Sequence, residues 1–254
     1  MTDQPPQRLS DDFWTDLRQL TAARIGLSRS GASLATAPLL DLKLAHSRAR
    51  DAVLEPLDTA RLAADLGGLS DPVLTVTSAA EQRLQYLMRP DLGRRLDAQA
   101  EAALKPHAGR WDIAFVVADG LSARAVQTHA RPVLSGIIEP LRGKGWQIAP
   151  LAIVRHGRVG IGDAAATSLG AACVAVLIGE RPGLSAADSM GAYLTWQPHA
   201  DTTDADRNCI SNIRPEGIGY ADAARKITHI LLAMHDRGYS GVRLKDESDR
   251  LLIG

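Results

Sequence analysis

The sequence predicts an α/β fold, in which a mostly parallel, Rossmann-like sheet carries helices on both faces and follows a smaller, mainly helical N-terminal region. Three observations support this prediction. The first hundred residues show mainly helical spacing of apolar side chains. From Trp111 onward, short apolar runs rich in β-branched residues alternate with helical patterns, as in parallel strands joined by crossover helices. Glycines and polar residues end these runs. The chain therefore divides into a helical region, residues 1–107, and a Rossmann-like α/β region, residues 108–254.

The helical region is predicted from apolar spacing and from its stop signals. Ser10-Asp11-Asp12 supplies an N-cap and an acidic first turn for the first helix. The run VLTVT at residues 73–77 predicts a strand, and Ser78 is expected to cap the helix that follows it. Pro90 ends that helix. The predicted helices of this region span residues 10–25, 39–54, 59–66, 78–88 and 91–104.

The α/β region begins with the run DIAFVVA, which predicts a buried strand. A long helical pattern follows, and Gly143 and Gly145 close it. The segment from His199 to Gly219 has no strong periodicity and is dense in Asp, Arg and Asn, so we expect a loop there. Strands are predicted at residues 112–118, 147–154 and 192–196 and in the apolar run that ends at Gly179; helices are predicted at residues 122–141, after the glycines that follow Arg155, and at 220–237.

Composition excludes several classes of function. Lysine plus arginine and aspartate plus glutamate both total 29, so no overall charge favours nucleic acid or an anionic membrane as a partner. No apolar run approaches the roughly 20 residues that a membrane helix needs. We therefore expect a soluble, cytoplasmic protein. Cys173 and Cys209 form neither a disulfide framework nor a metal-ligand spacing, and both are expected to be reduced thiols.

One glycine motif allows a dinucleotide interpretation. Gly160-Ile-Gly162-Asp-Ala-Ala165 satisfies the relaxed G-x-G-x-x-A pattern between a predicted strand and a helix. Glu180 lies twenty residues after Gly160, where it could hydrogen-bond a ribose. A nicotinamide-dependent oxidoreductase is therefore one hypothesis. Asp163 argues against it, because a carboxylate in the first helical turn would satisfy the positive helix end and repel a phosphate.

Two further polar segments are candidate binding surfaces. Glu180-Arg181 adjoins a proline-fixed turn at a strand end, and residues 201–214 form a polar loop near the same edge. The three aspartates of that loop do not have the spacing of a calcium loop, so no metal site is predicted. Cys209 could be a nucleophile only beside an activating base, and none is adjacent in sequence. The sequence indicates a ligand-binding edge without a self-contained catalytic centre.

Several motifs resemble those of the small subunit, or light chain, of ethanolamine ammonia-lyase. They are HGRVGIGD (156–163), GERPGL (179–184) and DRNCISNI (206–213), which occur in the same order and at nearly the same spacing in that family. Upstream segments at residues 20–25, 42–53, 86–96 and 117–126 are also similar. The resemblance covers about residues 17–241 and is too extended for coincidence.

This resemblance implies an adenosylcobalamin (coenzyme B12)-dependent lyase that converts ethanolamine to acetaldehyde and ammonia by a radical mechanism. The large subunit would hold the substrate, and this chain would contribute to cobalamin binding through Val159, Glu180 and Cys209. It would supply no catalytic residue and no metal ligand, and it would be active only with its partner. A hetero-dodecamer of six large and six small chains is implied, in the cytoplasm or within a bacterial microcompartment. The histidine motif that replaces the cofactor's own base is absent, which favours binding with dimethylbenzimidazole on cobalt.

Overall fold

A six-stranded sheet in the order β3-β5-β4-β6-β7-β8 is the centre of the fold. The computed structural model describes residues 11–246. The first four strands of the sheet are parallel, and the last two are antiparallel, which confirms the predicted mostly parallel α/β class. The strands are β3 (Val73–Thr77), β4 (Trp111–Ala118), β5 (Leu151–Arg155), β6 (Ala171–Gly179), β7 (Met190–Trp196) and β8 (Arg207–Ile213), with a separate hairpin of β1 (Arg29–Ser30) and β2 (Ser33–Leu34).

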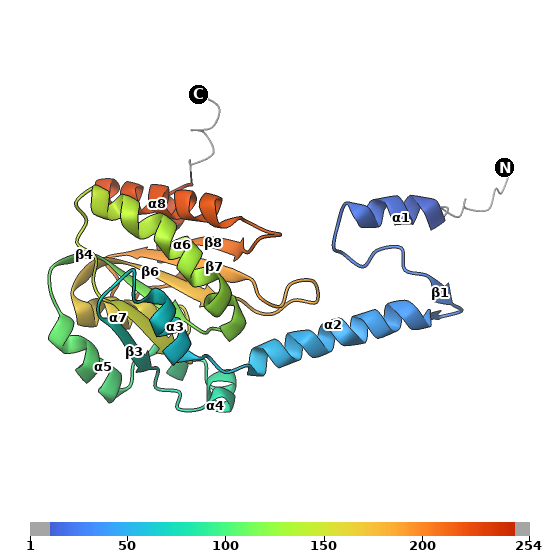
Figure 1. The fold of residues 1–254 in the computed structure, drawn as a ribbon, viewed down its shortest axis with the longest axis horizontal. Coiled ribbons are helices and arrows are strands. Elements are labelled where there is room, and N and C mark those ends of the chain that lie inside the picture. Colours follow the sequence, from blue (N-terminus) through green and yellow to red (C-terminus); the bar gives the residue numbers. More distant parts are fainter. Residues whose placement is uncertain (1–10, 247–254) are drawn as a thin grey trace, which may run out of the picture.

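Helices cover both faces of this sheet (Figure 1). Side chains of α3, α6 and α8 pack on one face, and those of α5 and α7 pack on the other. None of the helices among residues 11–246 is long and apolar enough to cross a membrane. The helices are α1 (Asp11–Gln19), α2 (Thr36–Leu54), α3 (Thr59–Leu66), α4 (Arg83–Met88), α5 (Ala98–Leu104), α6 (Ala123–Gly143), α7 (Ile161–Leu169) and α8 (Tyr220–Arg237), with 3₁₀ turns at Leu92–Arg94, Lys105–His107, Asp204–Asp206 and Gly241–Arg243.

The centre of the sheet is apolar on both sides. In β4 the last six residues are buried, with Phe115 facing α6 and Val116 facing α7. A strand that is covered on both faces needs no polar alternation, which explains why the continuous runs predicted these strands correctly. The sheet also takes β3 from the chain before residue 108. The division of the chain at residues 107 and 108 stays a prediction.

Two helices of the N-terminal region begin later than predicted. Ser78 does not cap a helix: its hydroxyl donates to the carbonyl of His156 at 2.8 Å, and its backbone bridges Leu96. That bridge continues the strand by one residue and delays α4 to Arg83. It also interrupts the helix predicted at residues 91–104, of which a 3₁₀ turn and α5 remain. The effective cap of α5 is Asp97, whose carboxylate accepts from the amide of Ala100 at 2.6 Å.

The predicted loop between His199 and Gly219 contains a strand. β8 pairs with β7 along the edge of the sheet, so the expectation of a continuous loop was wrong. The cause is its position, because an edge strand buries only part of its side chains and lacks an apolar run. Arg207, Ile210 and Ile213 are buried, whereas Cys209 and Ser211 are exposed.

The first 44 described residues form an extension that we call the arm (residues 11–54). It consists of α1, the β1–β2 hairpin and α2. Figure 1 shows α2 leading away from the rest of the described chain (residues 55–246), which we call the body; the C-terminal end of α2 is near α3 and α4, and its start is far from the sheet. Ala52 is the buried side chain of α2. The arm therefore adds almost nothing to the core of the described chain.

Candidate functional site

The connections after β4 and β5 leave the carboxyl edge of the sheet on opposite faces. α6 follows β4 and packs on one face, whereas α7 follows β5 and packs on the other. In open α/β sheets, ligands dock outside the strand ends at such a switch point. Val159 lies in the loop after β5, and Glu180 lies directly after β6. Two of the three predicted contact residues therefore stand at this edge.

The third residue, Cys209, lies on the outer strands and belongs to a surface that we call the shelf (Glu180, Gly191, Tyr193 and Cys209). Tyr193 of β7 is directly opposite Cys209 of β8, so the two side chains are cross-strand neighbours on one face of the sheet. A Cβ added to Gly191 would lie 3.0 Å from Oε1 of Glu180, so the carboxylate folds over a bare backbone position. The structure thus brings Glu180 and Cys209 together around Tyr193.

The thiol and the phenol of the shelf are not in their ionised, reactive forms. Cys209 is exposed at the edge of the sheet, but partial desolvation of its thiol by neighbouring groups raises the pKa, and Tyr193 only partly offsets that effect. Burial, the neighbouring Cys209 and Glu180 together raise the pKa of the Tyr193 hydroxyl well above its usual range. Both groups are therefore protonated and neutral at physiological pH. A thiolate is required for nucleophilic chemistry, so Cys209 suits packing against a ligand rather than attack on one.

Glu180 is held in position by the end of β8. The backbone amide of Asn212 donates to both carboxylate oxygens, at 3.1 and 3.3 Å. Asn212 has a positive φ of 58°, a conformation that asparagine tolerates better than most side chains. The carboxylate remains partly exposed and can accept further hydrogen bonds. It is a fixed acceptor at the border of the shelf.

Val159 opens onto a cavity of about 880 Å³ beside α7, which we call the α7 cavity. Arg207 lines this cavity and lies two residues before Cys209 on the same strand, so the cavity and the shelf adjoin. Arg94 packs along Gly160 with its side chain 3.5 Å from where a Cβ would be. The lining comprises Arg94, Arg95, Glu101, Arg158, Val159, Gly160, Asp163, Ala164, Thr167, Ser168, His199, Ala200, Thr202, Thr203, Asp204 and Arg207.

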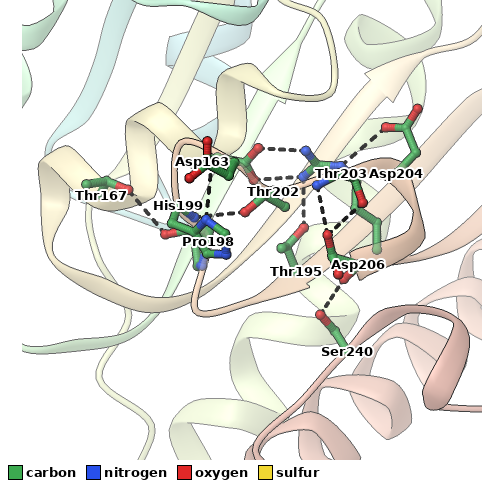
Figure 2. Close-up of polar contacts among 12 residues, drawn as sticks. Asp163, Thr167, Thr195, Pro198, His199, Thr202, Thr203, Asp204, Asp206 and Ser240 are labelled. Atoms are coloured by element: carbon green, nitrogen blue, oxygen red, sulfur yellow. Dashed lines mark hydrogen bonds and ion pairs between the residues drawn. The ribbon is translucent and has the colours of Figure 1, made fainter.

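A buried ion pair forms one wall of the α7 cavity (Figure 2). The guanidinium of Arg207 donates to both carboxylate oxygens of Asp163, at 2.6 and 2.7 Å, and to the hydroxyl of Thr195 at 3.1 Å. Asp204 lies 3.5 Å from its Nε atom. Asp163 was expected to satisfy the helix start and repel phosphate, but in the structure its carboxylate forms an ion pair with Arg207. Sequence spacing alone could not reveal this pair across 44 positions.

The glycine turn does not form a diphosphate cradle. The amides of Ile161, Gly162 and Asp163 donate to the carbonyls of Arg158, Val159 and Gly160. A diphosphate at a helix start needs such amides free. Gly162 instead allows close packing, because an added Cβ would overlap the side chain of Val176 on β6. The observed geometry therefore argues against the nicotinamide-dependent alternative.

Asp119 is a site residue whose role the sequence did not reveal. Its buried carboxylate accepts from the amide of Gly157 at 3.0 Å and from Arg83 Nη1 at 3.2 Å. Burial raises the pKa of Asp119, and the charge of Arg83 opposes that shift. These contacts tie the loop that carries Val159 to the end of β4. The available signal was the polar dipeptide Asp119-Gly120 at a predicted strand end.

The aspartates of the segment before β8 make contacts within the protein. Asp206 accepts from the amide and the hydroxyl of Thr203 at 2.8 and 2.7 Å, which closes a capping box. Asp204 faces Arg207. Within residues 11–246, no group of three or more His, Cys, Asp or Glu side chains could hold a metal ion. These residues support β8 and the Arg207 network.

Comparisons with known proteins agree with the motifs. Residues 11–245 match the family model described as ethanolamine ammonia-lyase light chain (EutC). A protein of Ralstonia nicotianae named "Ethanolamine ammonia-lyase small subunit" is 50% identical over 99% of this chain and 94% of its own length. Proteins with the same name from Azotobacter vinelandii and Xanthomonas campestris pv. campestris are 48% and 50% identical, over 98% and 96% of this chain and 93% and 91% of theirs.

Proposed function

The chain belongs to the ethanolamine ammonia-lyase light chain family, and on that premise we propose that it holds one side of a cobalamin cofactor against its shelf and its α7 cavity. The family acts in ethanolamine degradation as the small subunit of a cobalamin-dependent bacterial lyase, which has a large-subunit partner. One observation carries the proposal. Glu180 and Cys209 meet around Tyr193, and Val159 lines the cavity that adjoins them.

The residues of the shelf fit a corrin. A corrin is a broad, largely neutral ring edged with amides, which call for a flat apolar support and hydrogen-bond partners at its border. Tyr193 and Cys209 supply that support with neutral side chains, and Gly191 leaves room for the Glu180 carboxylate to fold over its backbone. Glu180 offers carboxylate oxygens to an amide N–H. The α7 cavity lies within the size range of small-molecule sites, about 300–1,000 Å³.

This chain binds and positions, and the reacting atoms lie elsewhere. When bound, adenosylcobalamin supplies a radical by homolysis of its cobalt–carbon bond. Glu180 would orient the ring by accepting an amide hydrogen bond, while Tyr193 and Cys209 exclude water beneath it. Val159 would pack against a part of the cofactor that enters the α7 cavity. The proposed site includes no catalytic residue and no metal ligand from this chain.

The assembly and its location complete the proposal. We infer a hetero-dodecamer of six large and six small subunits in the cytoplasm, with packaging in a bacterial microcompartment as an additional setting. The cofactor would lie between the two kinds of subunit, because the shelf supplies only one side. The mass of the co-purified complex tests the stoichiometry, and any mass other than that of six pairs contradicts it.

The experiment that tests the site is Glu180→Ala in the complex of both subunits. A hydrogen bond to a charged acceptor contributes about 1.5–3 kcal/mol, so adenosylcobalamin affinity should fall roughly 10- to 100-fold. Equilibrium dialysis in the dark measures that affinity, and thermal unfolding of the free chain should change little. Glu139→Ala is the matched control, because Glu139 is an exposed carboxylate on α6, which covers the opposite face of the sheet. Unchanged affinity in Glu180→Ala would contradict the assignment.

A further inference from the structure

Most exposed large hydrophobic side chains of the described chain lie in the arm or in segments that are hydrogen-bonded to it. The arm carries most of them, and a second group, which we call the rim (Leu84, Met88 and Leu184), lies on α4 and in the loop after β6. Single exposed leucines are ordinary, but a contiguous gathering marks an interaction surface. Among the described residues, the exposed large hydrophobics are Phe13, Leu20, Leu39, Leu40, Leu44, Leu54, Leu84, Met88 and Leu184, with Val242 apart from them in the 3₁₀ turn after α8.

Within residues 11–246, the first half of α2 buries no side chain, so it lacks the packing that normally stabilises a helix. Leu40 and Leu44 lie one turn apart and are 58% and 50% exposed, and Leu39 beside them is also exposed. Most helical stability in proteins comes from burying an apolar face rather than from intrinsic propensity. A leucine-rich helix segment with no core beneath it therefore requires a covering surface. The second half of α2 bears exposed charged side chains, as the border of an interface does.

The arm is attached to the same edge of the sheet as the cofactor shelf. At its base, Arg83 donates to the carbonyl of Val53 at 2.8 Å, and the same arginine pairs with Asp119 at the end of β4. Further out, Arg24 pairs with Asp41 of α2 at 3.0 Å and reaches the carbonyl of Leu184 at 3.4 Å. Leu184 lies four residues after Glu180. The arm and the rim are therefore connected to the carboxyl edge of the sheet, where Glu180 of the shelf lies.

We propose that α2 and the rim form the surface that binds the large subunit, with Leu40 and Leu44 at the centre of that surface. This inference rests on the proposed function, which places the cofactor between this chain and that partner. Because this surface is connected to the shelf, we infer that the large subunit covers it and not a second copy of this chain. A second copy of this chain seated symmetrically on the same side would press the two shelves together and close both to the cofactor. The large subunit, in contrast, can cover the arm while it completes the cofactor site.

The test is Leu40→Asp with Leu44→Asp, co-expressed with a tagged large subunit and purified without cofactor. A charge in the centre of an apolar interface should weaken subunit association at least about tenfold, which removes the small subunit from the eluate. Val242→Asp is the control, compared with each single variant Leu40→Asp and Leu44→Asp, because it adds one negative charge to an exposed apolar position away from the arm. Circular dichroism of the free chain checks that the variant folds. If it loses helix, Leu40→Ala with Leu44→Ala replaces it.

The outcomes separate this inference from the proposed function. Association at wild-type strength in the double variant overturns the gripping role of α2. A free chain that is dimeric, and that the double variant makes monomeric without affecting large-subunit binding, also overturns it in favour of a second copy. Glu180→Ala should lose cofactor affinity while it still co-purifies, so a failure of the cofactor site leaves the arm result intact. If the wild-type chain does not co-purify with the large subunit, both proposals fail.

Discussion

Helices α2 of the arm and α6 of the body are the two longest helices of the described chain. They differ in how many side chains they bury. α6 has 21 residues, of which ten are buried, whereas α2 has 19 residues and buries Ala52. Both sequences contain repeated leucine or valine among charged residues, and both predict a helix. The difference is the partner, because α6 packs on the sheet and α2 leaves it. The body thus buries the apolar face of its helix within the described chain, whereas the arm leaves its leucines for the partner surface that we propose.

The largest expected loss of stability follows from removing one member of the buried ion pair in the body. Arg207→Ala leaves the carboxylate of Asp163 buried without its bidentate partner. Removal of one member of a buried pair costs about 3–5 kcal/mol, so the free energy of unfolding should fall by that amount. Urea denaturation of the free chain measures it.

The arm provides the control for that experiment. Arg48→Ala removes an exposed arginine from α2, and the free energy of unfolding should change by less than about 0.5 kcal/mol. Equal losses in Arg207→Ala and Arg48→Ala would show that the buried pair adds nothing specific. Such a result would remove the energetic distinction between body and arm.

The same leucine-to-alanine substitution, made once in the body and once in the arm, compares the packing of the two regions directly. Leu134 of α6 is fully buried, and Leu44 of α2 is half exposed. Leu134→Ala should cost about 2–5 kcal/mol, from lost burial and the cavity left behind. Leu44→Ala should change the free chain by no more than about 0.5 kcal/mol. Chemical denaturation of the two variants gives both values, and a cost above 2 kcal/mol for Leu44→Ala would mean that the arm packs within its own chain.

Sequence patterns predicted the body well because its central strands are covered on both faces. Continuous apolar runs such as the one in β4 are unambiguous, and Gly170 and Gly238 end α7 and α8 in the left-handed conformation that glycine favours. β8 was missed because an edge strand with exposed Cys209 has no such run. The start of α4 was misplaced because a long-range bridge from Ser78 overrides a local capping signal.

The candidate site was predictable only in part. The residues Val159, Glu180 and Cys209 came from motifs, and the structure places them along one side of the sheet. Tyr193, which joins two of them, gave no signal, since its importance depends on cross-strand pairing with Cys209. The pairing of Asp163 with Arg207 was equally hidden, because the register of an unrecognised strand determines it. Contacts set by tertiary pairing leave no spacing to detect.

The smallest expected effect is on the pH dependence of unfolding, and it arises from His129 on the buried side of α6. His129 Nδ1 lies 2.9 Å from the hydroxyl of Tyr220, and its Nε2 atom has no hydrogen-bond partner in the described chain. Burial lowers the pKa of His129 below its ordinary value of 6.5, and the charge of Asp188 opposes that shift. The unfolded chain therefore takes up this proton first as pH falls, so the stabilising contribution is complete above pH 6.5 and is lost below it.

His129→Gln should consequently reduce the loss of stability between pH 7.5 and pH 5, as measured by urea denaturation at each pH. The effect is limited to one proton, which changes the free energy by at most about 1.4 kcal/mol for each pH unit. Thr128→Ala changes an exposed side chain of α6 that carries no titratable group, and it should leave the pH dependence of unfolding as it is in the wild type. If both variants shift the pH dependence equally, then protonation of His129 is not the cause.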